Sequence, residues 1–228
     1  MKTTIAKLLV GTSLLLAFSV PASATVIDFT GGTVTLLDSS TGTTNNSTVF
    51  QNVDYYEEGG FKLDFIEASN TGVFSTITGD YYVASNDVIH AHWLTGNYGD
   101  VTGIEITKVG GGLFDLNYFI LTSNTSTGGS VASGFEEAWV EGFASSVSTG
   151  AAVKLPPENW GFPATQIFLG SAFNSVDSVK FYVTNAVDCF GMDEFYIDEP
   201  APGTVPEPSS LALLSLGLAG LLRKRRAK

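Results

Sequence analysis

The feature that most constrains the fold is a two-residue alternation of apolar and polar side chains, which recurs along the chain in short runs. FKLDFI, SVKFYV and EFYID are three examples, and the side chains predicted to share a face are Phe61 with Leu63 and Phe65, Val179 with Phe181 and Val183, and Phe195 with Ile197. This period is typical of β-strands with one face packed on a core. A fourth run, LFDLNYFIL, predicts that Phe114, Leu116, Tyr118 and Ile120 face the core together.

Polar clusters separate about a dozen such runs, for example DSSTGTTNNS and SNTSTGG. Gly, Asn, Asp, Ser and Thr are the residues that tight turns favour, and the chain has 25 glycines. Short strands joined by turns predict an all-β fold, an antiparallel β-sandwich or jelly roll. No repeat of fixed period is visible, which disfavours a propeller or solenoid.

The two ends of the chain differ from this body. Residues 1–24 have a cationic start, an apolar run at 8–20 and the small-residue site ASA, which predicts a cleaved signal peptide and export through the Sec translocon. Residues 200–204 are a linker, and 205–228 contain an apolar run at 211–222 followed by a basic tail. Twelve residues give about 18 Å of helix against a hydrocarbon core of about 30 Å. We therefore expect a short hydrophobic helix that holds the chain in the membrane only transiently, with an ordinary tail anchor as the alternative.

This C-terminal segment resembles the PEP-CTERM sorting signal. The residues that carry the resemblance are Pro206, Glu207 and Pro208, and then, after the apolar run, Arg223, Lys224, Arg225 and Arg226. The resemblance implies an exported protein of a Gram-negative bacterium, many of which make exopolysaccharide. It also implies processing by an exosortase, an integral-membrane cysteine protease, and delivery to the cell surface or extracellular matrix.

The predicted β-sandwich domain, residues 25–199, is strongly acidic. It has four lysines and 22 carboxylates, which leaves a net charge of about −18, against −12 for the whole chain. Such a surface repels phosphate, so nucleic acids and anionic membrane surfaces are not expected partners. Solubility outside the cell is the simple explanation, and structural calcium is the alternative, with Asp28 on the first strand and Asp193 or Asp198 on the last as ligands.

HAHW is the sharpest local motif for a metal. On a strand, His90 and His92 point to the same face about 7 Å apart, close enough to share one ion. A third ligand would be a carboxylate such as Asp87 or Asp100, and the alternative is two histidines that face solvent or a neighbouring strand. The single cysteine, Cys189, forms no internal disulfide and is expected to be a buried small hydrophobe.

Aromatic residues in loops suit a polysaccharide-binding surface, because a ring face stacks on the C–H face of a sugar. Trp160 in PPENWGFP, Tyr98 in GNYGD, and Tyr55 and Tyr56 are the candidates, with core packing as the alternative. Neighbouring carboxylates on a strand point to opposite faces, and no G-x-S-x-G elbow, P-loop or dinucleotide motif is present. We therefore expect no catalytic residues, with a glycoside-active enzyme as the less favoured alternative.

YYEEGGFKLDF and VDSVKFYVTNAVDCFGMDEFYID are similar to a pattern of small PEP-CTERM proteins with a jelly-roll body like that of carbohydrate-binding modules. The resemblance implies a protein that binds or organises exopolysaccharide. A structural biofilm protein with no soluble ligand is the alternative.

Overall fold

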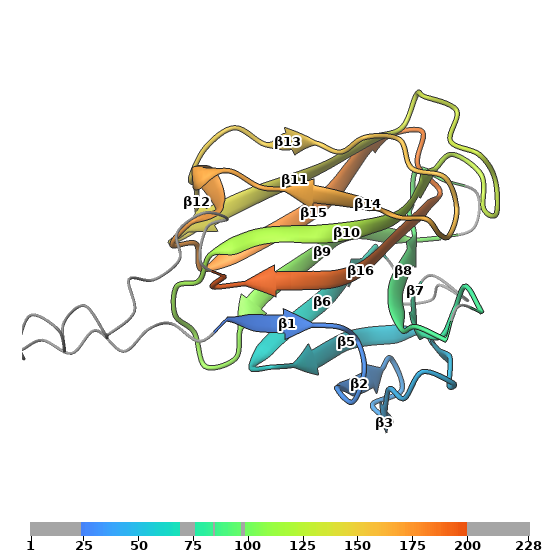
Figure 1. The fold of residues 1–228 in the computed structure, drawn as a ribbon, viewed down its shortest axis with the longest axis horizontal. Coiled ribbons are helices and arrows are strands. Elements are labelled where there is room, and N and C mark those ends of the chain that lie inside the picture. Colours follow the sequence, from blue (N-terminus) through green and yellow to red (C-terminus); the bar gives the residue numbers. More distant parts are fainter. Residues whose placement is uncertain (1–23, 69–75, 84, 97–98, 200–228) are drawn as a thin grey trace, which may run out of the picture.

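The computed structural model describes residues 24–68, 76–83, 85–96 and 99–199, and Figure 1 presents the fold. The predicted linker, the C-terminal segment and, except for Ala24, the predicted signal peptide lie outside these residues. In the described part, secondary structure is almost entirely β. The elements are β1 (Thr25–Ile27), β2 (Thr33–Leu36), β3 (Thr41–Thr43), β4 (Phe50–Gln51), β5 (Val53–Glu58), β6 (Phe61–Glu67), β7 (Thr76–Gly79), β8 (Val88–His92), β9 (Val101–Lys108), β10 (Leu116–Thr125), β11 (Glu137–Ala144), β12 (Val147–Ser148), β13 (Val153–Lys154), β14 (Thr165–Phe168), the 3₁₀ turn η1 (Ser171–Phe173), β15 (Ser178–Asn185) and β16 (Cys189–Ile197). Across the described ranges there is no helix of the length and apolarity that a membrane span requires.

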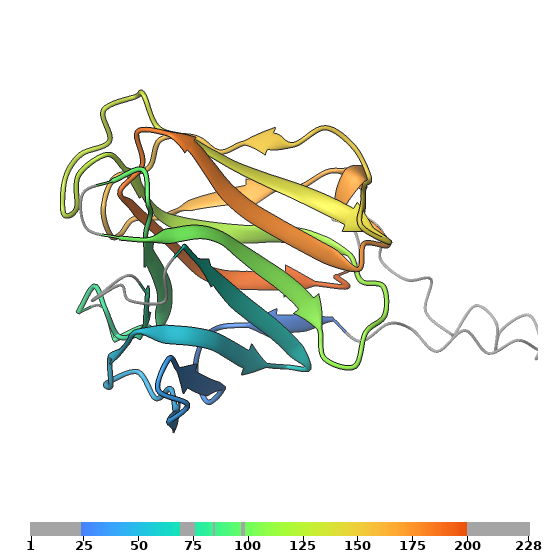
Figure 2. The same cartoon turned by 180° about the vertical axis from the view of Figure 1, so that it is seen from behind.

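These strands form two sheets, which confirms the predicted sandwich. Sheet A has the order β14-β10-β16-β8-β7-β4, with β1 also paired to β16. Sheet B has the order β12-β11-β15-β9-β6-β5-β2-β3, with β13 paired to β11. In Figure 1, β14, β10, β16 and β1 of sheet A lie toward the viewer, and Figure 2 presents sheet B from behind.

The core between the sheets is built from the alternating side chains that the sequence predicts. The predicted inward residues of β6, β15 and β16 are buried there, Val183 only partly. At the centre, the ring of Phe119 lies 5.2 Å from that of Phe181 and 5.6 Å from that of Phe195. Phe181 belongs to sheet B and the other two to sheet A, so these contacts hold the layers together.

The prediction for the start of β10 is wrong beyond Leu116. The pairing of β10 with β16 shifts register between Leu116 and Tyr118. After this irregularity Phe119 is buried, whereas Tyr118 and Ile120 are only partly buried on the other face. A β-bulge reverses the alternation in this way, because one extra residue moves every later side chain to the opposite face.

Strand β16 organises sheet A. Along one side it pairs with β10, and along the other side Cys189–Met192 pairs with β8 while Phe195–Ile197 pairs with β1. Phe119 lies opposite Phe195 and Leu121 opposite Met192, so β16 has one extra residue between these pairs. We call Cys189–Met192 the first half of β16 and Phe195–Ile197 the second half.

Candidate functional site

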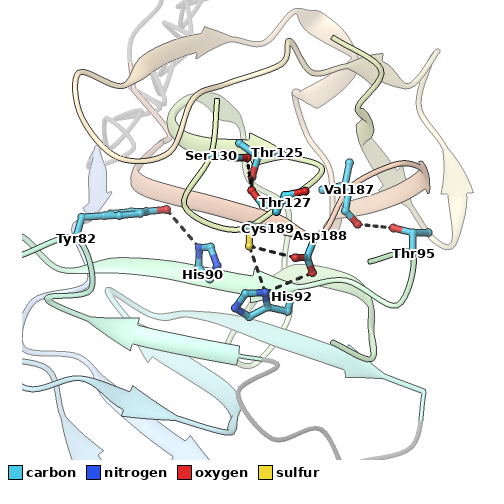
Figure 3. Close-up of polar contacts among 10 residues, drawn as sticks. All are labelled: Tyr82, His90, His92, Thr95, Thr125, Thr127, Ser130, Val187, Asp188 and Cys189. Carbon is cyan, nitrogen blue, oxygen red and sulfur yellow. Dashed lines mark hydrogen bonds and ion pairs between the residues drawn. The ribbon is translucent and has the colours of Figure 1, made fainter. Parts of the chain in front are cut away.

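The two histidines of β8 meet the single cysteine on the outer face of sheet A. His92 lies opposite Cys189 and His90 opposite Gly191 across the β8–β16 ladder. One potential ligand atom from each of His90, His92 and Cys189 lies within 4.8 Å of the others. We call these three residues the His-Cys cluster, and Figure 3 shows their side chains converging from β8 and β16. The prediction that the two histidines share a face is confirmed, since their ring centroids are 4.9 Å apart.

The Cys189 thiol lies in this cluster rather than among apolar groups alone. Its Sγ is 3.2 Å from Nδ1 of His92, and Asp188 Oδ1 is 3.5 Å from the same nitrogen. Cys189 has no exposed surface, which confirms its predicted burial. Burial and the neighbouring Asp188 carboxylate raise the pKa of the thiol, so it is a poor nucleophile in this state.

Tyr82 contacts both Ser123 and the buried His90. Tyr82 donates its hydroxyl proton to Ser123 Oγ at 3.1 Å, and its oxygen lies 3.3 Å from Nδ1 of His90. In the tautomer whose Nδ1 donates to Tyr82, Nε2 of His90 is an acceptor. His90 has no exposed surface, and its Nε2 has no hydrogen-bond partner among the residues that the structure describes. Burial, together with the charge of His92, lowers the pKa of His90 well below its ordinary value.

Two glycines make room for this arrangement. A Cβ on Gly191 would lie 2.3 Å from the Tyr82 hydroxyl and 2.6 Å from Thr122 Oγ1, so a side chain there would expel Tyr82. A Cβ on Gly128, in the loop between β10 and β11, would lie 2.9 Å from the Cys189 sulfur. The cluster therefore depends on close backbone approach at both positions.

The predicted carboxylate ligands of the histidines are elsewhere. Neither Asp87 nor Asp100 contributes an atom to the His-Cys cluster. Asp87 Oδ2 instead accepts a hydrogen bond from the backbone of Asn46 at 2.9 Å. Cys189 takes the third position because the β8–β16 register places it directly opposite His92, and this register is not visible in the sequence.

A second group of polar side chains joins the first and last strands, as predicted for calcium. β1 pairs with the second half of β16, so Asp28, which follows β1, comes near Asp193. We call Asp28, Asp87 and Asp193 the acidic cluster. Burial, with added repulsion from neighbouring carboxylates that include Asp28 and Asp87, raises the pKa of Asp193 to about 7.

Two carboxylates of the acidic cluster are buried, and each has one oxygen without a hydrogen-bond partner within the described ranges. They are Asp87 and Asp193, which are 0% and 3% exposed, and the oxygen is Oδ1 in each. Buried oxygens without partners are the reason to propose calcium here. Among the described residues, however, only the His-Cys cluster brings three potential ligand atoms within 4.8 Å of one another. Asp198, the other predicted ligand, does not belong here: its Oδ1 accepts a hydrogen bond from the backbone of Asp115, and its Oδ2 lies 3.7 Å from Lys108 Nζ.

The predicted polysaccharide-binding aromatics are scattered. Trp160 is partly buried, and its ring packs edge-on against Tyr82 and His90 at 5.0 and 4.9 Å, so it covers the His-Cys cluster. Tyr55 is half-buried under Lys62 Nζ at 4.3 Å. Tyr56 has no exposed surface, and its hydroxyl donates to Glu58 at 2.9 Å, so this structure does not present it to a sugar. Tyr98 lies outside the described residues.

A different set of aromatics is exposed on the outer face of sheet A. Tyr118 of β10 lies opposite Phe168 of β14 and opposite Tyr196 of β16, with ring centroids 5.3 and 4.0 Å away. Phe168 is 62% exposed. A pocket of about 270 Å³ opens beside these rings, and its lining includes Tyr118, Phe168, Asp115, Asn117 and Glu199. We call it the aromatic pocket.

The sequence does not predict this pocket, because the alternation in LFDLNYFIL predicts that Tyr118 faces the core. The bulge that turns Tyr118 outward depends on pairing with β16, a strand more than 70 residues later in the chain. The one local signal for the pocket is Phe168 in TQIF, an exposed aromatic residue on an edge strand.

Comparison with known proteins identifies one segment. A family described as the PEP-CTERM protein-sorting motif matches residues 204–226. No curated protein and no solved structure matches the chain. The motif indicates an exported protein that crosses the membrane to the cell surface and that an exosortase processes.

Proposed function

We propose that this exported, exosortase-processed protein binds a neutral polysaccharide at the cell surface or in the extracellular matrix, through the aromatic pocket of sheet A. The observation that carries the proposal is the pocket itself, in which the partly buried ring of Tyr118 and the exposed ring of Phe168 adjoin the polar side chains of Asn117 and Glu199. Aromatic walls with a few polar groups are the usual chemistry of a small-ligand site. The proposed route of export is the Sec translocon of a Gram-negative cell.

The size of the pocket suits one sugar unit of a chain. Its volume of about 270 Å³ lies just below the range of about 300–1,000 Å³ that is common for ligand sites. Its opening on a sheet face would let a polymer continue across the surface on both sides. We infer binding to a single sugar unit or a short stretch, which is weak for each site and useful in a matrix where many copies bind one polymer.

Charge selects the class of polysaccharide. Asp115 and Glu199 lie in the pocket lining, and the domain has a net charge of about −18. A polymer of uronic acids or sulfated sugars would be repelled by this surface. A neutral polymer, whose hydroxyl groups can donate to carboxylates, fits better.

We also propose that calcium stabilises the structure of the domain. Bound by Asp87 and Asp193, with Asp28 beside them, it would fasten the loop after β1 to the last strand. Extracellular modules bind calcium with dissociation constants of about 10⁻⁴ to 10⁻³ M, so the ion would be bound outside the cell and largely absent inside it.

Affinity electrophoresis in gels that contain neutral polysaccharide tests the binding site. Tyr118→Ala should abolish retardation, because it removes the central ring of the pocket. Tyr55→Ala is the matched control, a half-buried tyrosine on sheet B, and should be retarded like the parent protein. Absence of retardation of the parent on every neutral polysaccharide of its host would overturn the proposal and favour a structural matrix protein. Shortening of the polymer would favour the glycoside-active alternative.

A further inference from the structure

We propose that the His-Cys cluster is a binding site for a thiophilic late first-row transition-metal ion, of which Zn²⁺ is the probe, with His90, His92 and Cys189 as ligands. This inference is independent of polysaccharide binding. The cluster lies at the first half of β16, whereas the aromatic pocket lies beside the second half.

The ligand set itself selects the class of metal. Two imidazoles and one thiolate are the donors that zinc and copper prefer, whereas calcium and magnesium require oxygen. The His-Cys cluster therefore differs in donor chemistry from the acidic cluster, whose oxygens suit a hard cation.

The positions of the atoms are close to those that a tetrahedral ion needs. Bonds of about 2.1 Å to nitrogen and 2.3 Å to sulfur place ligand atoms about 3.3–3.8 Å apart. His92 Nδ1 and Cys189 Sγ are already 3.2 Å apart, and all three ligand atoms lie within 4.8 Å of one another. Small side-chain rotations would complete the site, and a carboxylate oxygen of Asp188, 3.5 Å from His92 Nδ1, is the adjacent fourth donor.

His90 supplies the independent observation that points to a ligand. Its Nε2 is fully buried and has no protein partner in the described part of the chain. In the tautomer whose Nδ1 donates to Tyr82, this nitrogen bears the lone pair that a metal ion binds. An unsatisfied buried acceptor costs about 1–3 kcal/mol, and a metal ion removes that cost. Its Nδ1 lies 3.3 Å from the Tyr82 hydroxyl, and a hydrogen bond there is the outer-shell contact that holds a metal-binding imidazole in its orientation.

Proton balance is simple. A divalent ion that binds displaces the thiol proton of Cys189. Each imidazole binds the ion through the nitrogen that carries the lone pair and keeps its one proton on the other nitrogen, so neither ring loses a proton. The overall step forms one metal–sulfur bond and two metal–nitrogen bonds and releases one proton to solvent. No oxidant or reductant takes part.

Metal binding also accounts for a cysteine in an exported chain. Thiols outside the cytoplasm are prone to oxidation. The backbone of Gly128 packs closely against Cys189, and metal ligation would further protect the sulfur from oxidation. The site is closed by Trp160, Tyr82 and the loop at Gly128, which favours a structural ion over a catalytic one.

Titration of the full chain with Zn²⁺ by calorimetry, together with Co²⁺ absorption, tests the site. We expect a single equivalent of Zn²⁺ per chain and, with Co²⁺, a near-ultraviolet band of sulfur-to-cobalt charge transfer. Cys189→Ser should abolish that band and weaken Zn²⁺ binding by more than about 100-fold, and Tyr82→Phe should weaken it by about 10-fold through loss of the outer-shell contact. Asp193→Asn is the matched control, since it alters the acidic cluster on the same strand and should leave Zn²⁺ binding unchanged.

The result that overturns the proposal is a cooperatively folded parent protein that binds no Zn²⁺, or that binds it equally well as Cys189→Ser. If Cys189→Ser fails to fold, the Co²⁺ band of the parent and the effect of Tyr82→Phe decide: no band, or unchanged affinity in Tyr82→Phe, refutes the site. Because retardation by polysaccharide does not require zinc, failure here leaves the proposed function standing, and the reverse also holds.

Discussion

The two halves of β16 lie on one strand and face the same side of sheet A, yet their surroundings are opposite. In the first half, loops cover the outer face, and Cys189 and Gly191 are fully buried against His92 and the Tyr82 hydroxyl. In the second half the outer face is open, and Tyr196 stacks on Tyr118 beside a pocket that reaches solvent. Each half has a paired strand on both sides, β10 with β8 for the first and β10 with β1 for the second, so an unpaired edge is not what separates the two environments.

What separates them is the loops that lie over one end of the sheet. The loop between β10 and β11 covers Cys189, and the segment with Tyr81 and Tyr82 covers His90 together with Trp160. These loops extend at the right-hand end of the molecule in Figure 1. Polar residues on an outer strand face therefore form a closed site where loops exclude water. They form a ligand surface where the loops leave the face open.

The largest effect on stability is expected when the loop between β10 and β11 loses the side chain that anchors it. The Glu136 carboxylate is buried and accepts hydrogen bonds from the backbone of Ser126, Ser133 and Gly134 at 2.7–3.1 Å. Glu136→Ala should lower the free energy of unfolding by about 3 kcal/mol and expose Cys189 to alkylation, because it leaves those backbone donors unpaired. Chemical denaturation and thiol labelling measure both effects.

Its matched control is Glu137→Ala. The neighbouring carboxylate is on the surface, 3.4 Å from Lys154 Nζ, and such a pair contributes at most about 1 kcal/mol. Equal losses of stability in the two variants would show that the loop is not held by Glu136.

The Gly191→Ala substitution tests the packing at the first half of β16 directly. The new methyl group would lie 2.3 Å from the Tyr82 hydroxyl, so Tyr82 must leave His90, and overpacking of this kind costs about 2 kcal/mol. Gly170→Ala, where nothing lies within 4 Å of the added carbon, should leave stability unchanged. Thermal unfolding of both variants tests this contrast, and a stable Gly191→Ala protein would contradict the described position of Tyr82.

Calcium should stabilise the junction between the halves. At about 10 mM calcium, a dissociation constant of about 10⁻³ M predicts about 1.4 kcal/mol of added stability. Asp193→Asn should remove this response, whereas Asp198→Asn should keep it, because Asp198 belongs to a different contact with Lys108. An unchanged unfolding midpoint in calcium would refute the ion at the acidic cluster.

The last test concerns Glu67 on sheet B, away from both halves. Burial, with added repulsion from Asp100 and Asp54, raises the pKa of Glu67 to about 7. A raised carboxyl pKa favours the folded state at low pH, so its contribution should be fully present below about pH 4.5 and be lost as pH rises through about 7. Comparison of unfolding free energies at several pH values should give a flatter profile for Glu67→Gln than for the parent, and identical profiles would contradict the shift.

Much of the fold follows from the sequence, because the alternation of FKLDFI and SVKFYV is set locally by strand geometry. The pairing of His90 with His92 on one face follows from the same period. Neither the β8–β16 register, which brings Cys189 to His92, nor the bulge that turns Tyr118 outward has a local signal. Both arise from pairing between strands far apart in the chain, and local propensity does not encode such partners.

Chemical-shift mapping with a neutral oligosaccharide tests the central claim, that the open half of this sheet face binds ligand and the covered half does not. We expect shifts at Tyr118, Phe168 and Glu199, with none at Trp160 or His90. Shifts confined to Trp160 and its neighbours, or no shifts with any neutral host oligosaccharide, would contradict it.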